Sequence, residues 1–339
     1  MIREALETLV SRRDLTETEA AAVMEEIMEG QATPSQLGGF LLALRMKGET
    51  PDEIAGLARV MRAKALRVET AGPVVDTCGT GGDGQGTFNI STAAAFVVAG
   101  AGLAVAKHGN RAASSQCGSA DVLEALGVKI DLTPEQVRAC LDDIGIAFMF
   151  AQTFHPAMRH AAPTRRELGT RTVFNVLGPL CNPAGARHQV LGVARPELVD
   201  LVSQALLRLG ATHVLVVHGE EGVDELVLNG PSIIAELDGG AIRRYTIDPD
   251  GFGLARAPLS ALAGGTAQEN AATMRRVLVG DAGPIQDAVL LNAAAAIVAG
   301  DRAGDLREGL ALARASLASG AALTKLDGLI KASQKFAAA

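Results

Sequence analysis

Apolar and polar positions alternate with a helical period over the first seventy residues. Thr16 with Glu19 reads as a capping box, and the stretches 33–36 (TPSQ) and 50–53 (TPDE) repeat one start signal: a threonine N-cap, a proline and a box-closing Gln or Glu. The apolar residues that recur on one face are Ile2, Leu6, Leu9 and Val10, then Val23 and Ile27, then Leu37, Phe40, Leu41 and Leu44, then Ile54, Leu57 and Met61. The pattern predicts a small helical bundle.

From Pro73 onward the pattern changes to short β-rich segments separated by helical ones, which is typical of an α/β domain. The expected strands are residues 74–77, 103–106, 146–150, 190–193, 213–217 and 233–237. We therefore expect an N-terminal helical domain over residues 1–72 and an α/β domain over 73–339. The larger domain should contain a central, mainly parallel sheet flanked by helices.

Composition narrows the function classes. The 339 residues are 48% hydrophobic with a net charge of −7, which argues against general binding to nucleic acid or anionic membranes. Four widely spaced cysteines without a C-x-x-C motif indicate reduced thiols and no metal cluster. The N-terminus lacks the apolar core of a signal peptide, and the uncharged runs 92–106 and 288–300 fall short of the roughly 18 to 20 residues of a membrane span. We expect two buried helices and a cytoplasmic protein.

The stretch from Asp76 to Thr92 carries the clearest chemical signal. A short apolar strand runs into a glycine-rich segment and then into a helix start, with Gly79, Gly81, Gly82 and Gly86 followed by Thr87, Asn89, Ser91 and Thr92. Glycines allow backbone N–H groups to approach a ligand, and a helix start adds unpaired donors. The segment suits a diphosphate in the loop and a monophosphate at the helix start. It matches neither common phosphate-loop motif, so a tight turn is the alternative.

Two further polar segments follow expected strands. After the second strand come Lys107 to Arg111 and then Ser114, Ser115, Gly118, Ser119 and Asp121, which could form a second wall of an anion site or a polar surface loop. After the strand at 213–217 come Glu220, Glu221, Asp224 and Glu225, whose oxygens suit Mg²⁺. Taken alone, that run favours a solvated acidic loop.

The motifs GTGGD, FNIST, KHGNR, GSADVLEALG and RRELGTRTVFNVLGPLCNPAG, with the Asp224–Glu225 pair, resemble in combination the anthranilate phosphoribosyltransferase family over essentially the whole chain. The resemblance implies transfer of the phosphoribosyl group of 5-phosphoribosyl 1-pyrophosphate (PRPP) to the amine of anthranilate, in tryptophan biosynthesis. It also implies that a segment near 163–177 joins the helical domain, that substrates bind between the domains, and that helical-domain surfaces form a homodimer.

The resemblance further assigns the donor site. The pyrophosphate is expected against Gly79, Thr80, Gly81, Gly82 and Asp83 with Ser119 opposite, and the remaining phosphate and ribose against Thr87, Asn89, Ser91, Thr92 and Lys107. Mg²⁺, two ions per subunit, is expected on Asp224, Glu225 and Ser91, while Glu220 and Glu221 stay on the surface. The Asp83 carboxylate would repel bare phosphate, so we expect it on a ribose hydroxyl, a backbone group or metal-bound water. Asn89 could equally be a helix cap.

For anthranilate, Arg165 is the candidate for the carboxylate because a guanidinium can form paired hydrogen bonds with it. The other expected contacts are Gly79, His108, Asn110, His155 in the entry channel and Gly178, although His108 could be structural. Arg166 and Glu167 are expected on an exposed helix face. No general base is assigned, because the aryl amine is already neutral at physiological pH. Gln152 departs from the Ala-Pro of many family members and bears on the shape of the anthranilate channel.

Two other functions fit parts of the pattern. A pyrimidine nucleoside phosphorylase shares the general architecture and places an anion at a glycine-rich loop, but it has no need of the Asp224–Glu225 pair. A non-catalytic relative that binds nucleic acid predicts a basic groove and eroded metal or acceptor residues. The negative net charge and the intact Arg165 argue against that reading.

Overall fold

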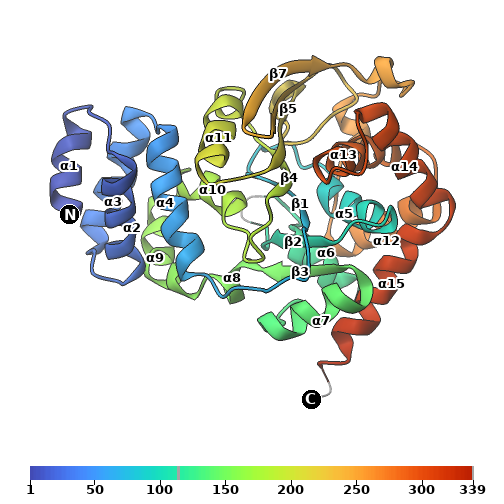
Figure 1. Cartoon of the computed structure of the whole chain (residues 1–339), viewed down its shortest axis with the longest axis horizontal. Helices are drawn as coiled ribbons and strands as arrows, with labels where there is room; N and C mark the ends of the chain where they lie inside the picture. The colour runs from blue at the N-terminus through green and yellow to red at the C-terminus, as the bar shows by residue number, and fades with distance from the viewer. Residues whose placement is uncertain (113–114, 338–339) are drawn as a thin grey trace.

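The computed structural model describes residues 1–112 and 115–337. The N-terminal bundle consists of α1 (Ile2–Val10), α2 (Glu17–Met28), α3 (Pro34–Lys47) and α4 (Pro51–Lys64), at the blue end of the chain in Figure 1. The three predicted capping boxes are confirmed. The Thr16, Thr33 and Thr50 side chains each accept a hydrogen bond from the backbone N–H three residues on, and the side chain of that later residue accepts one from the backbone N–H of the threonine. The prediction for Val10 was wrong, because it turns outward and is 72% exposed.

In the described residues, seven strands form one sheet in the order β3-β2-β1-β4-β5-β6-β7. The strands are β1 (Val75–Gly79), β2 (Val105–Gly109), β3 (Ile146–Phe150), β4 (His188–Gly192), β5 (His213–Gly219), β6 (Ser232–Asp238) and β7 (Ala241–Ile247). Strands β1 to β5 pair in parallel and β6 and β7 are antiparallel, so the mainly parallel sheet is confirmed. The sequence pattern missed β7, an edge strand with mostly solvent-facing side chains that follows a tight turn at Gly239 and Gly240.

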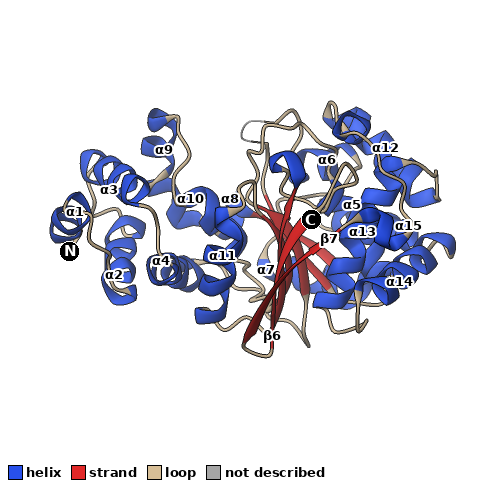
Figure 2. Ribbon diagram, turned by 90° about the horizontal axis from the view of Figure 1, so that it is seen from above, coloured by secondary structure: helices blue, strands red, loops and turns tan. Residues whose placement is uncertain are grey.

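Helices cover both faces of the sheet (Figure 2). One face carries α5 (Ile90–Gly100), α12 (Ala267–Val279), α13 (Pro284–Ala299), α14 (Leu306–Ala318) and α15 (Ala321–Gln334). The other carries α11 (Glu197–Arg208), whose apolar side chains share a continuous core with the N-terminal bundle. The remaining helices are α6 (Ser119–Ala125), α7 (Pro134–Ile144), α8 (Ala151–Phe154), α9 (Ala162–Leu168) and α10 (Phe174–Leu177).

The two uncharged runs end up differently. Residues 288–299 form a buried part of α13, as predicted. Residues 92–106 do not form one helix: they comprise α5 from Thr92 to its end at Gly100, a turn and the first two residues of β2. No single helix among the described residues combines the length and the apolar character of a membrane span; only α12 and α13 together would, and they are bent by 72° at their junction.

The connections of the sheet change direction between β1 and β4. From β1 the chain proceeds to β2 and β3 on one side, whereas β4 pairs on the other side and leads to β5. Strands β1 and β4 lie in register, so that Gly79 pairs with Gly192 at their carboxyl ends. In open α/β sheets, ligands bind outside the carboxyl ends of the strands at such a reversal. The fold therefore places the segments after β1, β4 and β5 where a ligand is expected.

The amino end of β5, on the opposite side of the sheet from this site, carries an ionic cluster around the buried His213. His213 at the start of β5 contacts Asp301 through Nδ1 at 2.6 Å and Glu236 through Nε2 at 3.2 Å, and Glu236 also accepts from Arg243 at 2.8 Å. The hydrogen bond with Glu236, followed by that with Asp301, raises the pKa of His213 to about 9 despite its burial. The same contact lowers the pKa of Glu236 to about 2. Protonated His213 therefore links β5 to β6 and to the segment after α13.

The raised pKa of His213 predicts a loss of stability in mild alkali. Because the folded-state pKa lies above the unfolded value, the stabilisation is complete below about pH 6.5 and is lost as the pH rises through about 9. We expect the free energy of unfolding to fall by about 1 kcal/mol over this range, a modest value because water screens the exposed Asp301. Urea denaturation across the range should show a flatter profile for His213→Asn. An equal decline in the variant would exclude this cluster as the cause.

Candidate active site

The glycine-rich loop starts at the end of β1 and is tied to the neighbouring strand. The Thr80 N–H donates to the Gly192 carbonyl at 2.9 Å. Gly81 and Gly82 have φ values of +63° and +67°, a left-handed conformation that side chains disfavour. Asp83 Oδ1 accepts from the Gln85 N–H at 3.1 Å, so this carboxylate binds a backbone group, which was one of its expected partners. The loop is thus sharply turned, and its residues 81, 82 and 84–86 are exposed.

The acidic pair lies directly against this loop. Asp224 Oδ2 accepts from the Gly81 N–H at 2.6 Å, and Glu225 Oε1 accepts from the Ser91 N–H at 3.1 Å in the first turn of α5. The structure thereby joins the segment after β5 to both halves of the predicted phosphate site. Glu220 and Glu221 are exposed, as expected for surface residues.

Electrostatics at the pair favour a cation. Burial, followed by repulsion from Asp83, raises the pKa of Asp224. Burial, followed by repulsion from Asp224, raises the pKa of Glu225. The buried Asp83 Oδ2 has no hydrogen-bond partner within the described residues. Three carboxylates that repel one another, one with a free oxygen, create a local negative charge that a cation such as Mg²⁺ would neutralise.

The protein residues alone do not complete a metal site. Within residues 1–112 and 115–337, no group of three or more His, Cys, Asp or Glu side chains is arranged to hold a metal ion. Mg²⁺ usually keeps several waters and binds through one or two carboxylates together with substrate phosphates. The arrangement therefore fits an ion that arrives with a phosphorylated ligand.

Ser91 lies between the acidic pair and Lys107. The Lys107 side chain donates to the Thr77 carbonyl and lies 3.4 Å from Ser91 Oγ. Lys107 is only 3% exposed, and burial lowers its pKa, with the charge of Asp76 opposing the shift. The ammonium group is thus enclosed beneath the start of α5, where it contacts Ser91. Thr92, the next residue, is buried.

Asn89 holds the N-cap position of α5 without capping it through its side chain. Its amide donates to the Cys117 carbonyl at 3.1 Å and accepts from Asn270 of α12 at 2.9 Å. The cap interpretation of its side chain was therefore wrong. Asn89 instead connects the start of α5 to the segment before α6 and to α12.

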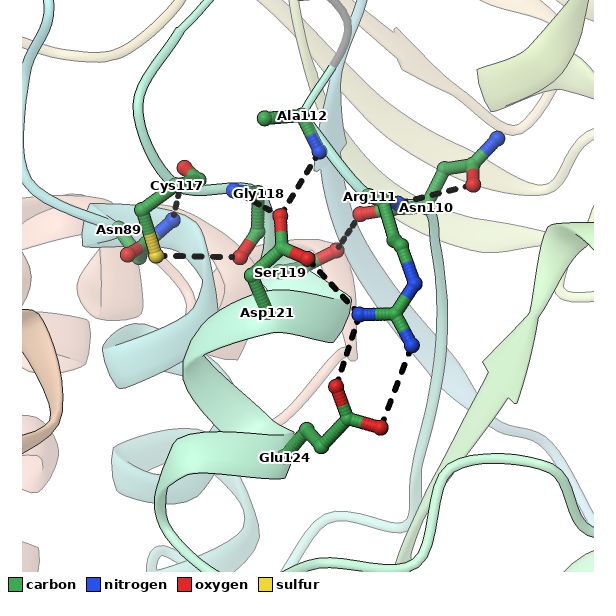
Figure 3. Close-up of polar contacts among 9 residues, drawn as sticks. All are labelled: Asn89, Asn110, Arg111, Ala112, Cys117, Gly118, Ser119, Asp121 and Glu124. Carbon is green, nitrogen blue, oxygen red and sulfur yellow. Dashed lines mark hydrogen bonds and ion pairs between the residues drawn. The ribbon is translucent and has the colours of Figure 1, made fainter. Parts of the chain in front are cut away.

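The KHGNR segment forms its own cluster with α6 (Figure 3). Asp121 accepts from the backbone N–H groups of Ala112 and Gly118, both at 2.9 Å, and Arg111 binds Asp121 and Glu124. Ser119 Oγ donates to the Asn110 carbonyl at 3.2 Å, so both predicted residues belong to this cluster. Ser114 lies outside the described residues. Thr87 forms a β-bridge with Ala263, separate from this cluster.

The structure pairs two predicted histidines. The rings of His108 and His155 lie 5.1 Å apart, and their buried Nε2 atoms lack partners among the described residues. Burial lowers the pKa of His108 to about 3 and that of His155 to about 4, so both rings are neutral at physiological pH. The backbone of Gly178 lies near His108, where it opposes the lowering of the His108 pKa. Two unsatisfied ring nitrogens are thus available to a polar group.

Arg165 presents a cation in a partly buried setting. Its guanidinium carbon lies 4.9 Å from the centroid of the Phe174 ring, and burial lowers the arginine pKa. Within the described residues its guanidinium forms no ion pair. Arg166 and Glu167 are exposed, as predicted. A desolvated cation beside an aromatic ring is chemically suited to a ligand carboxylate.

Several supporting residues escaped the sequence reasoning. The side-chain amide of Asn292 in α13 accepts from the Leu226 N–H at 2.9 Å and donates to its carbonyl at 2.8 Å, which fixes the residue after Glu225. Asn182 donates to Asp76 at 2.8 Å, and the other oxygen of Asp76 accepts from the His108 N–H at 3.2 Å. A lone Asn within the apolar run of α13 was the available signal.

The chain matches both domains of one glycosyl transferase family: residues 3–65 match its helical bundle domain and residues 71–323 its a/b domain. Fold and site thus define a glycosyl transferase of this two-domain class. The chain is 62% identical over 335 residues to the anthranilate phosphoribosyltransferase of Chloroflexus aggregans, with 98% of each covered, and 56% identical to that of Moorella thermoacetica, with 100% of each covered. It belongs to the anthranilate phosphoribosyltransferase family.

Solved structures agree with this assignment. The crystal structure of anthranilate phosphoribosyltransferase from Thermus thermophilus has a TM-score of 0.93 at 50% identity, covering 97% of this chain and 99% of that one. The enzyme of Saccharomyces cerevisiae, solved in complex with PRPP and Mg, has a TM-score of 0.90 at 30% identity, with 98% of each chain covered.

Gly79→Ala tests how closely the loop packs against the acidic pair. A Cβ at this position would lie 2.3 Å from Asp224 Oδ2, so the carboxylate would have to move. We expect affinity for magnesium pyrophosphate, measured by calorimetry, to fall by roughly 10-fold or more, since tenfold corresponds to about 1.4 kcal/mol. Gly72→Ala, where nothing lies within 4 Å of the added carbon, is the matched control. If Gly79→Ala bound magnesium pyrophosphate as tightly as the wild type, the close packing of Gly79 against Asp224 would have no role in binding that ligand.

Proposed function

We propose that this protein transfers the phosphoribosyl group of PRPP to the amine of anthranilate, giving N-(5-phosphoribosyl)anthranilate and pyrophosphate in tryptophan biosynthesis. The observation that carries the proposal is the contact of Asp224 and Glu225 with the Gly81 and Ser91 N–H groups, at the carboxyl edge of the sheet. This contact brings carboxylates that could bind a metal ion next to backbone N–H groups that could bind phosphate. Relatives of this name match over almost the whole chain.

On the donor side, the glycine-rich loop would hold the pyrophosphate and the start of α5 the 5-phosphate and ribose. The proposed contacts are Gly79, Thr80, Gly81, Gly82, Asp83, Thr87, Asn89, Ser91, Thr92, Lys107 and Ser119. Backbone N–H groups of a glycine-rich loop can bind phosphate oxygens, and the helix start adds the positive end of its dipole. Lys107 would act at short range from beneath Ser91, because its ammonium group is enclosed.

Asp224, Glu225 and Ser91 would hold Mg²⁺, with two ions per subunit. The bound ions would neutralise the charge that develops on the departing pyrophosphate. Within the protein, the same charge relieves the repulsion that raises the pKa of both carboxyl groups. The similar yeast enzyme has been solved with PRPP and Mg, which supports this proposal.

On the acceptor side, Arg165 would bind the anthranilate carboxylate, and Gly79, His108, Asn110, His155 and Gly178 would surround the ring and amine. The neutral rings of His108 and His155 can donate or accept without bringing a cation near the oxocarbenium-like centre. In the reaction, the bond from the anomeric carbon to pyrophosphate would break with the electron pair leaving on pyrophosphate, the bond to the amine nitrogen would form, and the nitrogen would lose a proton to water. Positioning and charge stabilisation supply the catalysis, without an assigned general base.

The proposal includes the organisation of the chain. Residues 1–72 with the segment near 163–177 would act as one helical unit, which is supported by the shared core of Phe40, Ala161 and Phe174. A homodimer through the helical surface is supported by the outward-facing Val10 and Met46, which are 72% and 75% exposed. A cytoplasmic location fits the four free cysteines.

The direct test mixes the protein with PRPP, anthranilate and Mg²⁺ and follows the loss of anthranilate fluorescence. We expect turnover that requires all three and that stops on chelation of the metal. Magnesium-independent cleavage of a pyrimidine nucleoside by phosphate would replace this proposal with a phosphorylase. Tight binding of DNA or RNA at moderate salt without turnover would favour a non-catalytic relative.

Asp224→Asn combined with Glu225→Gln should separate activity from stability. We expect turnover to fall by roughly 10²-fold or more, because the departing charge loses its counter-ion. The variant should unfold at higher denaturant than the wild type above neutral pH, since carboxyl groups with raised pKa values destabilise the fold when ionised. Glu220→Gln with Glu221→Gln is the control, with both properties unchanged. Full activity of the Asp224→Asn, Glu225→Gln variant at limiting Mg²⁺ would show that the metal binds at another site.

Arg165→Ala should affect one substrate only. We expect kcat/KM for anthranilate to fall by roughly 10²-fold, because the ligand carboxylate would be left without its partner. PRPP affinity, measured by calorimetry, should change little. Arg166→Ala, which removes an exposed cation from the same helix, should leave both unchanged. Loss of PRPP affinity with intact anthranilate kinetics would show that Arg165 does not bind anthranilate.

A further inference from the structure

An arginine outside the predicted site holds the glycine-rich loop by its carbonyls. The Arg171 guanidinium donates through one terminal nitrogen to the Gly82 carbonyl and through the other to the Gly81 carbonyl. Within the described residues this arginine has no ion-pair partner. The planar fork of a guanidinium suits two adjacent acceptors, which an ammonium group cannot bridge in the same way.

The geometry of the peptide bond gives this contact a second consequence. The Gly81 carbonyl shares a peptide plane with the Gly82 N–H, and the Gly82 carbonyl shares one with the Asp83 N–H. Both bonds are trans, so each N–H points away from the carbonyl of its own plane. With both carbonyls turned toward Arg171, the N–H groups of Gly82 and Asp83 point away from the guanidinium.

The backbone that carries Arg171 is itself held by the N-terminal bundle. Arg45 of α3 donates to Thr170 Oγ1 at 2.5 Å and to the Arg171 carbonyl. On its other side the loop ends at the acidic pair, because the Gly81 N–H donates to Asp224. A continuous series of polar contacts thus runs from α3 through residues 170–171 and the glycine loop to Asp224.

We propose that Arg171 is a positioning residue that orients the Gly82 and Asp83 N–H groups toward the pyrophosphate of PRPP, and that Arg45 transmits the position of the helical bundle to this loop. The inference rests on the proposed function, because it assigns the ligand of those two donors. Arg165 lies six positions before Arg171, between the same bundle and the loop. One short segment therefore contributes to the acceptor side and orders the donor side.

Calorimetric titration with PRPP in the presence of Mg²⁺, alongside steady-state kinetics, tests the role of Arg171. We expect Arg171→Met to weaken PRPP binding roughly 10- to 100-fold, the loss of two charge-assisted hydrogen bonds, with KM for anthranilate within about twofold of wild type. Arg171→Lys keeps the charge but not the fork, and should remain roughly tenfold weaker than wild type. Arg138→Met, an exposed arginine of α7, is the matched control and should bind normally.

Arg45 is tested in a double-mutant cycle. Arg45→Met alone should weaken PRPP binding by roughly three- to tenfold, and it should add almost nothing in the Arg171→Met background, because it acts through that residue. Multiplicative effects of the two changes would overturn the coupling. Full rescue by Arg171→Lys would overturn the positioning role in favour of direct contact with phosphate. Normal PRPP binding by Arg171→Met would overturn the inference, whereas absence of PRPP binding by the wild type would overturn the proposed function.

Discussion

The site depends on an unusually close approach between the segment after β5 and the ends of three strands. A Cβ on Gly192 would lie 1.6 Å from the Asp224 carbonyl oxygen, one on Gly79 2.3 Å from Asp224 Oδ2, and one on Gly219 2.5 Å from the Glu225 carbonyl oxygen. A side chain at Gly79 would displace the Asp224 carboxylate, whereas at Gly192 and Gly219 it would meet backbone, so glycine there is a requirement of the close approach. It allows two carboxylates to be set into the carboxyl edge of the sheet, against the backbone donors of the next loop.

Carboxylates placed this way repel one another, and the surrounding structure must hold them against that repulsion. Asn292 does so from the far side by pairing with both backbone groups of Leu226, and Lys107 supplies a buried positive charge near Glu225. A network of this kind is stable when its members are satisfied, and the free oxygen of Asp83 is the exception. The unsatisfied group lies where a cation is expected, whereas the supporting groups are paired.

The sequence predicted what local chemistry determines. Threonine capping boxes placed the starts of α2, α3 and α4, and apolar runs placed six strands to within a few residues, because caps and burial patterns are encoded within one segment. β7 was missed because most of its side chains face solvent and form no apolar run, unlike those of the buried edge strand β3. Contacts over long sequence separations, such as that of Arg171 with Gly82, leave no local signature. The lone Asn292 in an apolar run signals a buried polar contact, but not that its partner is Leu226. The donor residues were recognised as a motif, but their mutual geometry required the fold.

The donor and acceptor candidates differ in how they use burial. On the donor side, burial raises the pKa of Asp224 and Glu225, so the protein prepares a position where positive charge is favourable. On the acceptor side, burial keeps His108 and His155 uncharged and leaves Arg165 as the permanent cation beside Phe174. Under the proposed function, an anionic ring acid would be attracted to Arg165, while its neutral amine would meet neutral groups. Because the two sides are built on different elements, their relative placement depends on the segment from α9 to Arg171, the part of the chain that contacts both the bundle and the loop.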